Sequence, residues 1–219
     1  MSFYEDRILP RIIDLTMRGG DFSRLRKACL ANVRGTVLEI GFGSGLNLPW
    51  YTDQVQRLYA LDPAELGRKL AQKRLARAPF PVQFIDLDEG ARNLYPLADG
   101  SVDHAVSTWT LCTIPDPAEA LYEIRRVLKP GGAFHFVEHG LAPDASVRKW
   151  QDRLNPIQNK IAGGCNLNRN FDEIIADAEF EFADLEHFYM SGPRVGTYIY
   201  KGIARPSTIA LEPKDRLNI

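Results

Sequence analysis

The chain has 219 residues, a formal net charge of -1 and a hydrophobic content of 45%. These values are typical of one globular domain. Near-neutral charge argues against broad binding along a nucleic-acid backbone, which needs clustered Lys and Arg, and leaves a local basic patch as the alternative. No stretch approaches the ~20 apolar residues of a membrane span, and the first residues lack the basic and apolar regions of a signal peptide. We expect a cytoplasmic protein without stable membrane insertion, with peripheral membrane contact as an alternative; the sequence sets no oligomeric state.

The three cysteines, Cys29, Cys112 and Cys165, form no CxxC pair. An odd number is typical of a reducing cytoplasm rather than of a disulfide framework. The four histidines lie far from these cysteines along the chain, unlike the close spacing of zinc ligands. We therefore predict neither a disulfide nor a structural metal site.

Short apolar runs alternate with amphipathic stretches along most of the chain. Helices are expected over residues 4–17, 21–33, 64–78, 118–128, 146–161 and 171–178. Strands are expected over residues 36–40, 58–62, 82–85, 102–109, 133–137, 180–190 and 196–204. Asp116 followed by Pro117 is a candidate start for the fourth helix.

This alternation predicts an α/β fold, in which a mostly parallel seven-stranded sheet has helices on both faces. The last two strands are joined by a short turn and should pair antiparallel as a C-terminal hairpin. We expect one domain over residues 1–206, with a helical cap over about residues 1–34 and a tail over 207–219. Ligands of such sheets bind beyond the carboxyl ends of the strands.

The strongest motif is a strand that runs directly into alternate glycines, since residues 37–45 read VLEIGFGSG. Glycines there let the backbone turn sharply and approach a ligand closely. The spacing is GxGxG, whereas dinucleotide sites use GxGxxG, and Asn47 occupies the later position. An ordinary glycine turn is the alternative interpretation.

Two carboxylates accompany the glycines. Asp62 ends the second predicted strand, seventeen residues after Gly45, where it can accept hydrogen bonds from both ribose hydroxyls of an adenosine; a helix cap before Pro63 is the alternative. Glu39 lies inside an apolar strand, which is costly unless the carboxylate is paired. We expect it to stabilise the glycine loop or to face a ligand amino group, with an outward-facing strand position as the alternative. A sulfonium nucleoside fits better than a dinucleotide, because it has an amino group and no pyrophosphate.

Over roughly Thr36 to Gly140 the chain resembles the class I S-adenosylmethionine-dependent methyltransferases. The resemblance rests on VLEIGFGSG, on the LDP turn that contains Asp62, and on LADGSVDHAVSTWTLCTIPDPAEALYEIRRVLKPGGAFHFVEHG. It implies a Rossmann-like fold and S-adenosylmethionine as cofactor. The cofactor-binding residues that it implies are Glu39, Gly41, Phe42, Gly43, Gly45, Asn47, Asp62, Pro63, Glu89, Gly90, Ala91 and Thr108. The adenine contact stays open between Asp88, Glu89 and the Ala91 backbone.

The flanking segments are similar to a subgroup that contains alkyl-thiol methyltransferases. They include Tyr4 with Arg7, GLNLPWY over residues 45–51, Glu138-His139, and GCNLNR over residues 164–169. Bacterial phospholipid N-methyltransferases share part of the N-terminal pattern. The resemblance implies a small and mainly apolar acceptor, with a thiol sulfur favoured and a phospholipid or quinone-like N, O or C acceptor as the alternative.

Candidate acceptor residues surround the expected cofactor site. Trp109, at the end of the fourth strand, would cover the methyl group or shape an apolar acceptor pocket, with ordinary core packing as the alternative. Tyr4 and Tyr51 would close one side of the pocket. Arg169 would pair with an anionic acceptor or, as we prefer, with Asp172 or Glu173. His139 is the candidate catalytic base, because its unperturbed pKa of ~6.5 suits proton transfer near neutrality; a hydrogen bond to a loop carbonyl is the alternative. Cys112 is expected to be a small buried side chain.

Two other classes of function stay in view. A domain that binds S-adenosylmethionine as a sensor or scaffold would show no turnover. A nicotinamide-dependent oxidoreductase is disfavoured by the GxGxG spacing and by the terminal hairpin.

Overall fold

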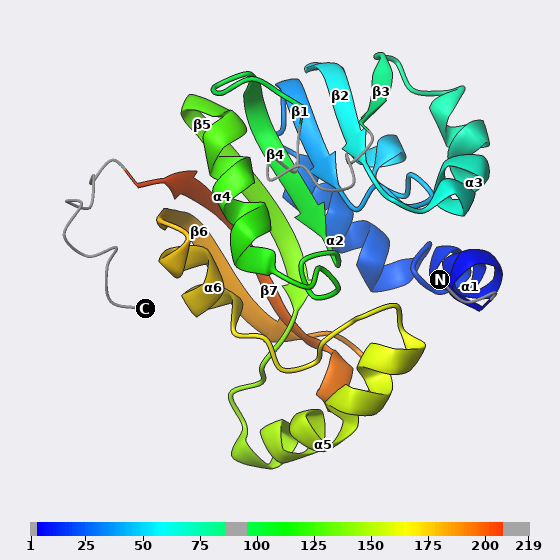
Figure 1. Cartoon of the computed structure of the whole chain (residues 1–219), viewed down its shortest axis with the longest axis vertical. Coiled ribbons are helices and arrows are strands. Elements are labelled where there is room, and N and C mark those ends of the chain that lie inside the picture. Colours follow the sequence, from blue (N-terminus) through cyan, green and yellow to red (C-terminus); the bar gives the residue numbers. More distant parts are fainter. Residues whose placement is uncertain (1–3, 86–95, 208–219) are drawn as a thin grey trace.

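The computed structural model describes residues 4–85 and 96–207 (Figure 1). The adenine contact expected from Asp88, Glu89, Gly90 or Ala91 and the tail over 208–219 lie outside these described residues. Within the described ranges, none of the helices combines the length and apolar character needed to cross a bilayer.

Seven strands form one sheet in the order β3-β2-β1-β4-β5-β7-β6 (Figure 1). They are β1 (Gly35–Ile40), β2 (Val55–Leu61), β3 (Val82–Ile85), β4 (Val102–Thr108), β5 (Leu128–His139), β6 (Phe180–Tyr189) and β7 (Tyr198–Pro206). Strands β1 to β5 pair in parallel, whereas β7 lies antiparallel between β5 and β6. The predicted α/β fold with an antiparallel C-terminal hairpin is confirmed.

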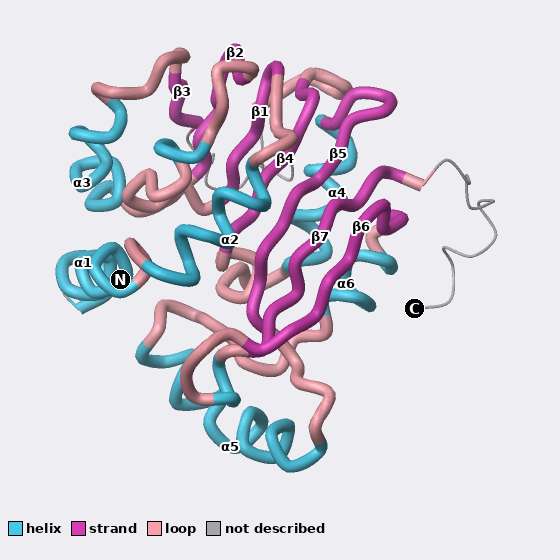
Figure 2. The backbone as a smooth tube through the Cα atoms, turned by 180° about the vertical axis from the view of Figure 1, so that it is seen from behind, coloured by secondary structure: helices cyan, strands magenta, loops and turns pink. Residues whose placement is uncertain are grey.

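The helices cover both faces of this sheet. They are α1 (Leu9–Thr16), preceded by a π-helical turn (Tyr4–Ile8), and α2 (Gly20–Leu30), α3 (Glu65–Leu75), α4 (Pro117–Val127), α5 (Ala145–Ile161) and α6 (Phe171–Asp177). Figure 1 shows α4 and α6 in front of the sheet, and Figure 2 shows α2 on the opposite face. Helices α1 and α5 lie beyond the ends of the strands, where a ligand of this fold binds.

Strand β1 shows why the sheet needs both layers. Leu38 and Ile40 point into the core formed with α4 and α6, whereas Val37 points into the core formed with α2 and α3. Side chains alternate between the faces of a strand, so Glu39 shares the face of Val37 at the carboxyl end. An apolar residue at position 39 would extend the core, whereas the Glu39 carboxylate places a charge at the carboxyl end of β1.

Two predicted boundaries illustrate local physics. The Asp116 carboxylate accepts a 3.0 Å hydrogen bond from the Glu119 amide, and α4 begins at Pro117, so the predicted helix start is confirmed. In contrast, β5 begins at Leu128 rather than at Ala133. Leu128 pairs with Val102 ahead of an irregularity in the ladder, so tertiary pairing extends the strand through a Pro-Gly-Gly segment that predicted a break.

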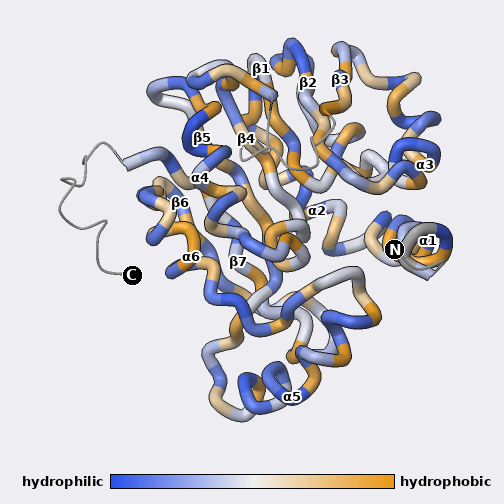
Figure 3. Tube along the Cα trace, in the orientation of Figure 1, coloured by the Kyte–Doolittle hydropathy of each residue, from blue (hydrophilic) through white to orange (hydrophobic). Residues whose placement is uncertain are grey.

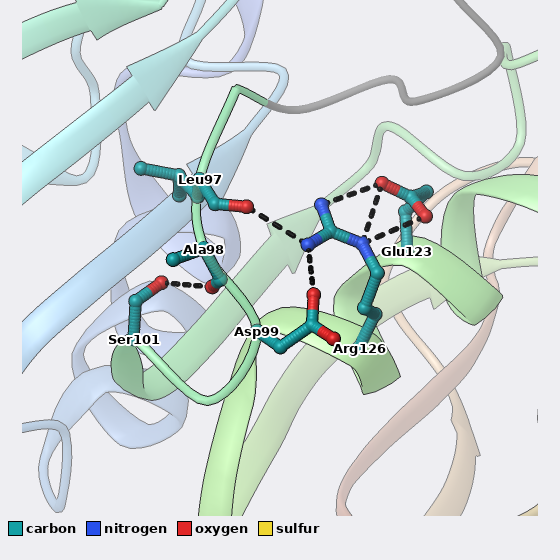
Figure 4. A network of polar contacts seen from close by, with 6 residues as sticks. All are labelled: Leu97, Ala98, Asp99, Ser101, Glu123 and Arg126. Carbon is teal, nitrogen blue, oxygen red and sulfur yellow. Dashed lines mark hydrogen bonds and ion pairs between the residues drawn. The ribbon is translucent and has the colours of Figure 1, made fainter.

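One charged network anchors the loop that leads into β4 (Figure 4). The Arg126 guanidinium on α4 donates to the Leu97 carbonyl at 2.8 Å, pairs with Asp99 at 2.6 Å and pairs with Glu123 at 2.8 Å. These contacts attach the loop before β4 to helix α4, and so help to position the start of that strand.

Candidate active site

A cavity of about 610 Å³ opens at the carboxyl ends of β1, β2 and β4. Its volume falls within the range of small-molecule sites. The wall formed by helix α1 is apolar, and Figure 1 shows α1 at the side of the molecule where β1 and β2 end. The lining includes Leu9, Pro10, Ile13, Met17, Arg26, Glu39, Gly41, Phe42, Gly43, Asn47, Asp62, Pro63, Thr108, Trp109, Thr110, Thr113, Ile114, Ala162 and Gly163.

The glycine loop forms one wall because its backbone has no room for side chains. Gly41 has a φ of +68°, and a Cβ there would collide with the Thr110 side chain. Gly67 in α3 contacts the loop so closely that a Cβ would lie 2.7 Å from the Gly43 carbonyl oxygen. Predicted residues Gly41 and Gly43 line the cavity, but Gly45 does not and instead lies against Leu48 and Phe42.

Asp62 braces this loop from the end of β2. Its Oδ2 accepts a 2.6 Å hydrogen bond from the Gly43 amide, and its Oδ1 accepts a 2.8 Å bond from the Ala64 amide. Burial raises the pKa of Asp62, and these two backbone bonds oppose the shift. Helix α3 is capped by Ala64, so Asp62 is not the N-cap residue. A carboxylate offers about four acceptor positions, so each oxygen retains capacity toward the cavity.

Glu39 is the most deeply buried acid of the cavity, 1% exposed. Its Oε1 accepts a 2.9 Å hydrogen bond from Asn47 Nδ2, and its Oε2 accepts a 2.8 Å bond from the Tyr51 hydroxyl. Asn47 also donates to Thr108 Oγ1 at 3.1 Å. Burial raises the pKa of Glu39 to about 7, against the opposing effect of the bonds from Tyr51 and Asn47. The outward-facing alternative for Glu39 is therefore wrong.

A second buried charge, Arg26 of α2, lies on the same cavity and was not predicted from the sequence. It is 3% exposed, its Nη1 donates to the Met17 carbonyl at 2.8 Å, and its guanidinium carbon lies 4.9 Å from the Trp109 ring centroid. Burial lowers the pKa of Arg26 to about 10, and the charge of Glu39 opposes the shift. Among the described residues, its buried Nε has no hydrogen-bond partner. A ligand anion would satisfy this donor.

Trp109 occupies a strained position next to Arg26. It is the residue after β4, it lines the cavity, and its φ of +53° lies in the left-handed region that bulky residues avoid. Its amide donates to the Val137 carbonyl at 2.7 Å, and its ring meets Phe22 edge-on at 5.1 Å. Such strain concentrates at functional sites, which supports the predicted role of Trp109 in shaping the cavity.

Helix α1 is attached to the glycine loop by a buried acid that sequence reasoning also missed. The Asp14 carboxylate accepts a 2.7 Å hydrogen bond from Ser44, lies 3.1 Å from Arg74 Nη1 and pairs with Arg18. Burial favours the neutral form, but the bonds from Arg18 and Ser44 outweigh it and lower the pKa of Asp14. The helix therefore closes the cavity as an anchored cap.

Three predicted acceptor residues lie elsewhere. The Tyr4 hydroxyl donates to the Ile161 carbonyl at 2.8 Å, and Tyr51 is buried against Glu39; neither lines the cavity. Arg169 donates to the carbonyls of Leu111, Ile114 and Pro115, so both the anionic-acceptor role and the preferred pairing with Asp172 or Glu173 are wrong. Carbonyls of an irregular loop lack partners within secondary structure, and Arg169 supplies donors to three of them at once.

His139 likewise lies outside the cavity lining. Its Nε2 lies 3.0 Å from Cys165 Sγ, and Cys165 Sγ lies 3.8 Å from Cys112 Sγ. The cavity gives His139 no route to a substrate proton, so the prediction of a catalytic base is corrected, and its partner is a thiol rather than a loop carbonyl. The inference that histidines and cysteines lie too far apart is also wrong, because the fold brings distant segments together. Cys112 is buried as predicted.

The strand order with a reversed β7, together with a glycine loop braced by the acid after β2, defines a Rossmann-like methyltransferase class. The profile of a methyltransferase domain matches residues 38–136. Human thiol S-methyltransferase TMT1A is 34% identical over 184 residues, which cover 82% of this chain and 74% of the human protein. The chain therefore belongs to the S-adenosylmethionine-dependent methyltransferase family that includes the thiol S-methyltransferases. It is an S-adenosylmethionine-dependent methyltransferase, and S-adenosylmethionine is its cofactor.

More distant relatives act on other acceptors or are known for their fold. Phosphatidylethanolamine N-methyltransferase of Cereibacter sphaeroides is 27% identical over 74% of this chain and 78% of that protein. A solved S-adenosylmethionine-dependent methyltransferase of Thermotoga maritima superposes with a TM-score of 0.61 at 21% identity, covering 89% of this chain and 92% of the other. The [4+2]-cyclase SpnF reaches a TM-score of 0.63 at 19% identity over 84% of this chain and 80% of the other. The fold alone therefore does not fix the reaction.

Proposed function

We propose that this protein transfers a methyl group to the sulfur of a small apolar thiol. The apolar wall of the cavity, built by Leu9, Ile13 and Met17 of the N-terminal segment with Trp109 and Ile114, carries this proposal. It offers an alkyl chain an environment from which water is displaced. The 34% sequence identity to a human thiol S-methyltransferase supports the same class of acceptor.

We propose that the polar side of the cavity binds the cofactor. Asp62 would accept from the ribose hydroxyls, Glu39 would face the ammonium group, and Arg26 would use its unpartnered Nε toward the carboxylate. The backbone of Gly41 and Gly43 would allow close approach. The bound cofactor supplies an electrophilic methyl group on a sulfonium.

The titratable side chains help to explain why a thiol suits this site. Among the described residues, the titratable side chains that line the cavity are those of Arg26, Glu39 and Asp62. Asp62 is committed to two backbone amides, and Glu39 to Asn47 and Tyr51, so neither is a free base. A thiol ionises more readily than an alcohol and reacts as a thiolate, so its proton can pass to solvent before the acceptor is enclosed. The residues then need only orient the sulfur and exclude water.

An acceptor panel tests this proposal. The full-length protein is incubated with S-adenosylmethionine carrying a deuterated methyl group and with an alkyl thiol, a phosphatidylethanolamine vesicle or a demethylated quinol, and products are read by mass spectrometry. We expect a labelled thioether. A labelled lipid or quinol without a thioether would replace the thiol by the alternative acceptors, and no product from any of them, despite cofactor binding, would favour a sensor.

Two positions on α1 provide a matched pair for the acceptor wall. Ile13 lines the cavity, whereas Leu15 is 71% exposed and does not. Ile13→Ala should raise the KM for a long-chain thiol, and Leu15→Ala should leave it unchanged. Equal KM values for both variants would remove α1 from the acceptor site.

We place the protein in the cytoplasm and expect no nucleic-acid partner. The three described cysteines are buried free thiols, which suits a reducing compartment. Ile8 of the π-helical turn and Ile12 and Leu15 of α1 are exposed, and they support a peripheral contact with a lipid surface from which an apolar acceptor would enter. Figure 3 shows that α1 carries hydrophobic residues.

A further inference from the structure

Three side chains that commonly bind metals meet behind the cavity wall. Cys112 follows β4, His139 ends β5, and Cys165 lies in the connection between α5 and α6. The two sulfur atoms are 3.8 Å apart, His139 Nε2 is 3.0 Å from Cys165 Sγ, and all three ligand atoms lie within 4.8 Å of one another. The exposed fractions are 1%, 8% and 7%, so the cluster is buried but borders accessible space.

The spacing of these atoms suits a tetrahedral ion. Zinc bonds of about 2.3 Å to sulfur and about 2.0 Å to nitrogen place two sulfur ligands about 3.8 Å apart and a sulfur and a nitrogen about 3.5 Å apart. The Cys112–Cys165 separation of 3.8 Å already matches, and the His139–Cys165 distance of 3.0 Å needs to widen by about 0.5 Å.

The backbone around Cys112 is held by two charged side chains, the buried Glu138 and the half-buried Arg169. Glu138 Oε1 accepts hydrogen bonds from the amides of Thr110 and Leu111, both at 2.9 Å. On the other side Arg169 donates to carbonyls of the same loop, among them that of Ile114 at 2.7 Å. The loop therefore holds Cys112 in one position, as a preformed ligand site requires.

Direct contacts also join the Cys112 loop to the Cys165 segment. The Asn166 amide and its side-chain Nδ2 both donate to the Cys112 carbonyl, at 2.9 and 3.1 Å. Gly164, with a φ of +87°, allows the Thr113 carbonyl to approach within 3.1 Å of where a Cβ would stand. These contacts align the two sulfur atoms without any covalent link.

We propose that Cys112, His139 and Cys165 bind one zinc-like divalent cation, with solvent in the fourth position. Two thiolates and an imidazole are the donor set of a borderline-soft ion. Binding forms two metal–sulfur bonds and one metal–nitrogen bond and releases two protons to solvent. None of the three ligands lines the cavity, so the metal site is distinct from the site of the proposed methyl transfer. The ion would fix the segments that carry the cavity residues Thr113 and Gly163, and thereby the shape of the cavity.

A disulfide between Cys112 and Cys165 is the competing use of the cluster. It would require the sulfur atoms to approach from 3.8 Å to about 2.05 Å and would leave His139 without a function. A metal needs ligand separations of about 3.5–3.8 Å, the three ligand atoms already lie within 4.8 Å of one another, and the metal uses all three side chains, so the geometry favours it.

Cobalt(II) titration of the reduced, metal-free full-length protein tests the site. We expect one equivalent to bind, with a thiolate-to-cobalt charge-transfer band in the near ultraviolet and intense tetrahedral visible bands. Cys112→Ser and Cys165→Ser should each weaken binding at least about 100-fold, because even changes outside the ligand set cost 10–100-fold. Cys29→Ser is the matched control, since Cys29 is a buried thiol outside the cluster, and it should keep the spectrum.

The outcomes separate this proposal from the proposed function. Cobalt binding without a thiolate band, or wild-type affinity and band intensity in both cluster variants, would overturn the site. Formation of a Cys112–Cys165 disulfide with no metal uptake by the reduced wild type would replace it by a redox pair. Far-ultraviolet circular dichroism and S-adenosylmethionine binding verify that each variant is folded. The cobalt titration of the wild type tests the site even if a variant does not fold. Methyl transfer to a thiol is measured separately, so its absence leaves the metal result intact.

Discussion

Glu39 should make cofactor binding depend on pH, and the Glu39→Gln variant isolates that effect. Its carboxylate contacts Asn47 and Tyr51, and the charges of Arg26 on α2 and Asp62 at the end of β2 act on it. Burial raises its pKa to about 7. Because an ammonium group beside it favours the ionised carboxylate, binding of S-adenosylmethionine near neutrality should release a proton.

The magnitude follows from the fraction of Glu39 that is ionised in the free protein. With a pKa of about 7, roughly 3% of Glu39 is ionised at pH 5.5 and about half at pH 7. If only the ionised form binds, Kd should fall about 16-fold over this interval, or about 1.6 kcal/mol. This pH interval stays below the pKa of an α-amino group, ~7.7–8.0, so the ammonium group of the cofactor keeps its charge.

Calorimetric titration at the two pH values, in buffers of different ionisation enthalpy, measures both Kd and proton release. At pH 5.5 the wild type should release about one proton per cofactor, since nearly all Glu39 is protonated before binding. Glu39→Gln should bind S-adenosylmethionine more weakly, release fewer protons on binding and lose most of the pH dependence of Kd. The same dependence in wild type and variant would refute the assignment of Glu39 to the ammonium group.

The raised pKa also predicts how stability changes without cofactor. The folded state binds the Glu39 proton more tightly than the unfolded state, so the contribution of Glu39 to the free energy of unfolding should decline as pH rises from about 4.5 to about 7. The decline should be about 3 kcal/mol relative to Glu39→Gln, measured by urea unfolding. A difference between wild type and variant that stays constant with pH would contradict the buried, proton-binding environment.

Three further substitutions test the remaining polar contacts. Arg26→Gln should raise the Kd for S-adenosylmethionine at least about tenfold, because a charged hydrogen bond contributes about 1.5–3 kcal/mol; an unchanged calorimetric Kd would exclude Arg26 from the cofactor carboxylate. Asp14→Asn should lower the free energy of urea unfolding by about 1–2 kcal/mol through loss of its charged bonds to Ser44 and Arg74, and a wild-type midpoint would show that α1 is held by other contacts. Arg169→Ala should destabilise the protein by about 1–3 kcal/mol, because the carbonyl of the buried Leu111 and that of the half-buried Ile114 lose a charged donor; full stability with a raised KM for an anionic acceptor would restore the role that the structure removes.

The sheet could be predicted from the sequence because its central parallel strands, β1 and β4, are mostly buried and appear as short runs rich in apolar residues. The range expected for β3, Val82–Ile85, agrees with the structure. The start of α4 and the hairpin followed from Asp, Pro and Gly positions. Helices α2 and α3 instead end at Leu30 and Leu75, three residues before the predicted ends. The start of β5 did not, since pairing with β4 overrides the local preference of Lys129 to Gly132.

The site was predicted where backbone geometry dictates the residue and missed where side chains meet across the fold. Gly41 and Asp62 stand at fixed places in a strand-to-helix turn, so spacing reveals them. Arg26 and Asp14 look like ordinary polar residues of amphipathic helices. They are buried because Asp14 meets Ser44 of the glycine loop and Arg26 meets Met17 and Trp109. Cys112 and Cys165 lie 53 residues apart in the chain and meet only because the fold brings the segment after α5 against the loop that follows β4.

Calorimetric titration with S-adenosylmethionine, its demethylated product and NADH tests the central claim that the cavity between the glycine loop and α1 is the cofactor site. Wild type and Asp184→Ala, a control at an exposed acid of β6, should bind both sulfur compounds and give no response to NADH. Asp62→Ala should weaken that binding at least about tenfold, since it removes a charged acceptor of about 1.5–3 kcal/mol. Undiminished binding by Asp62→Ala, or a response to NADH alone, would contradict the account.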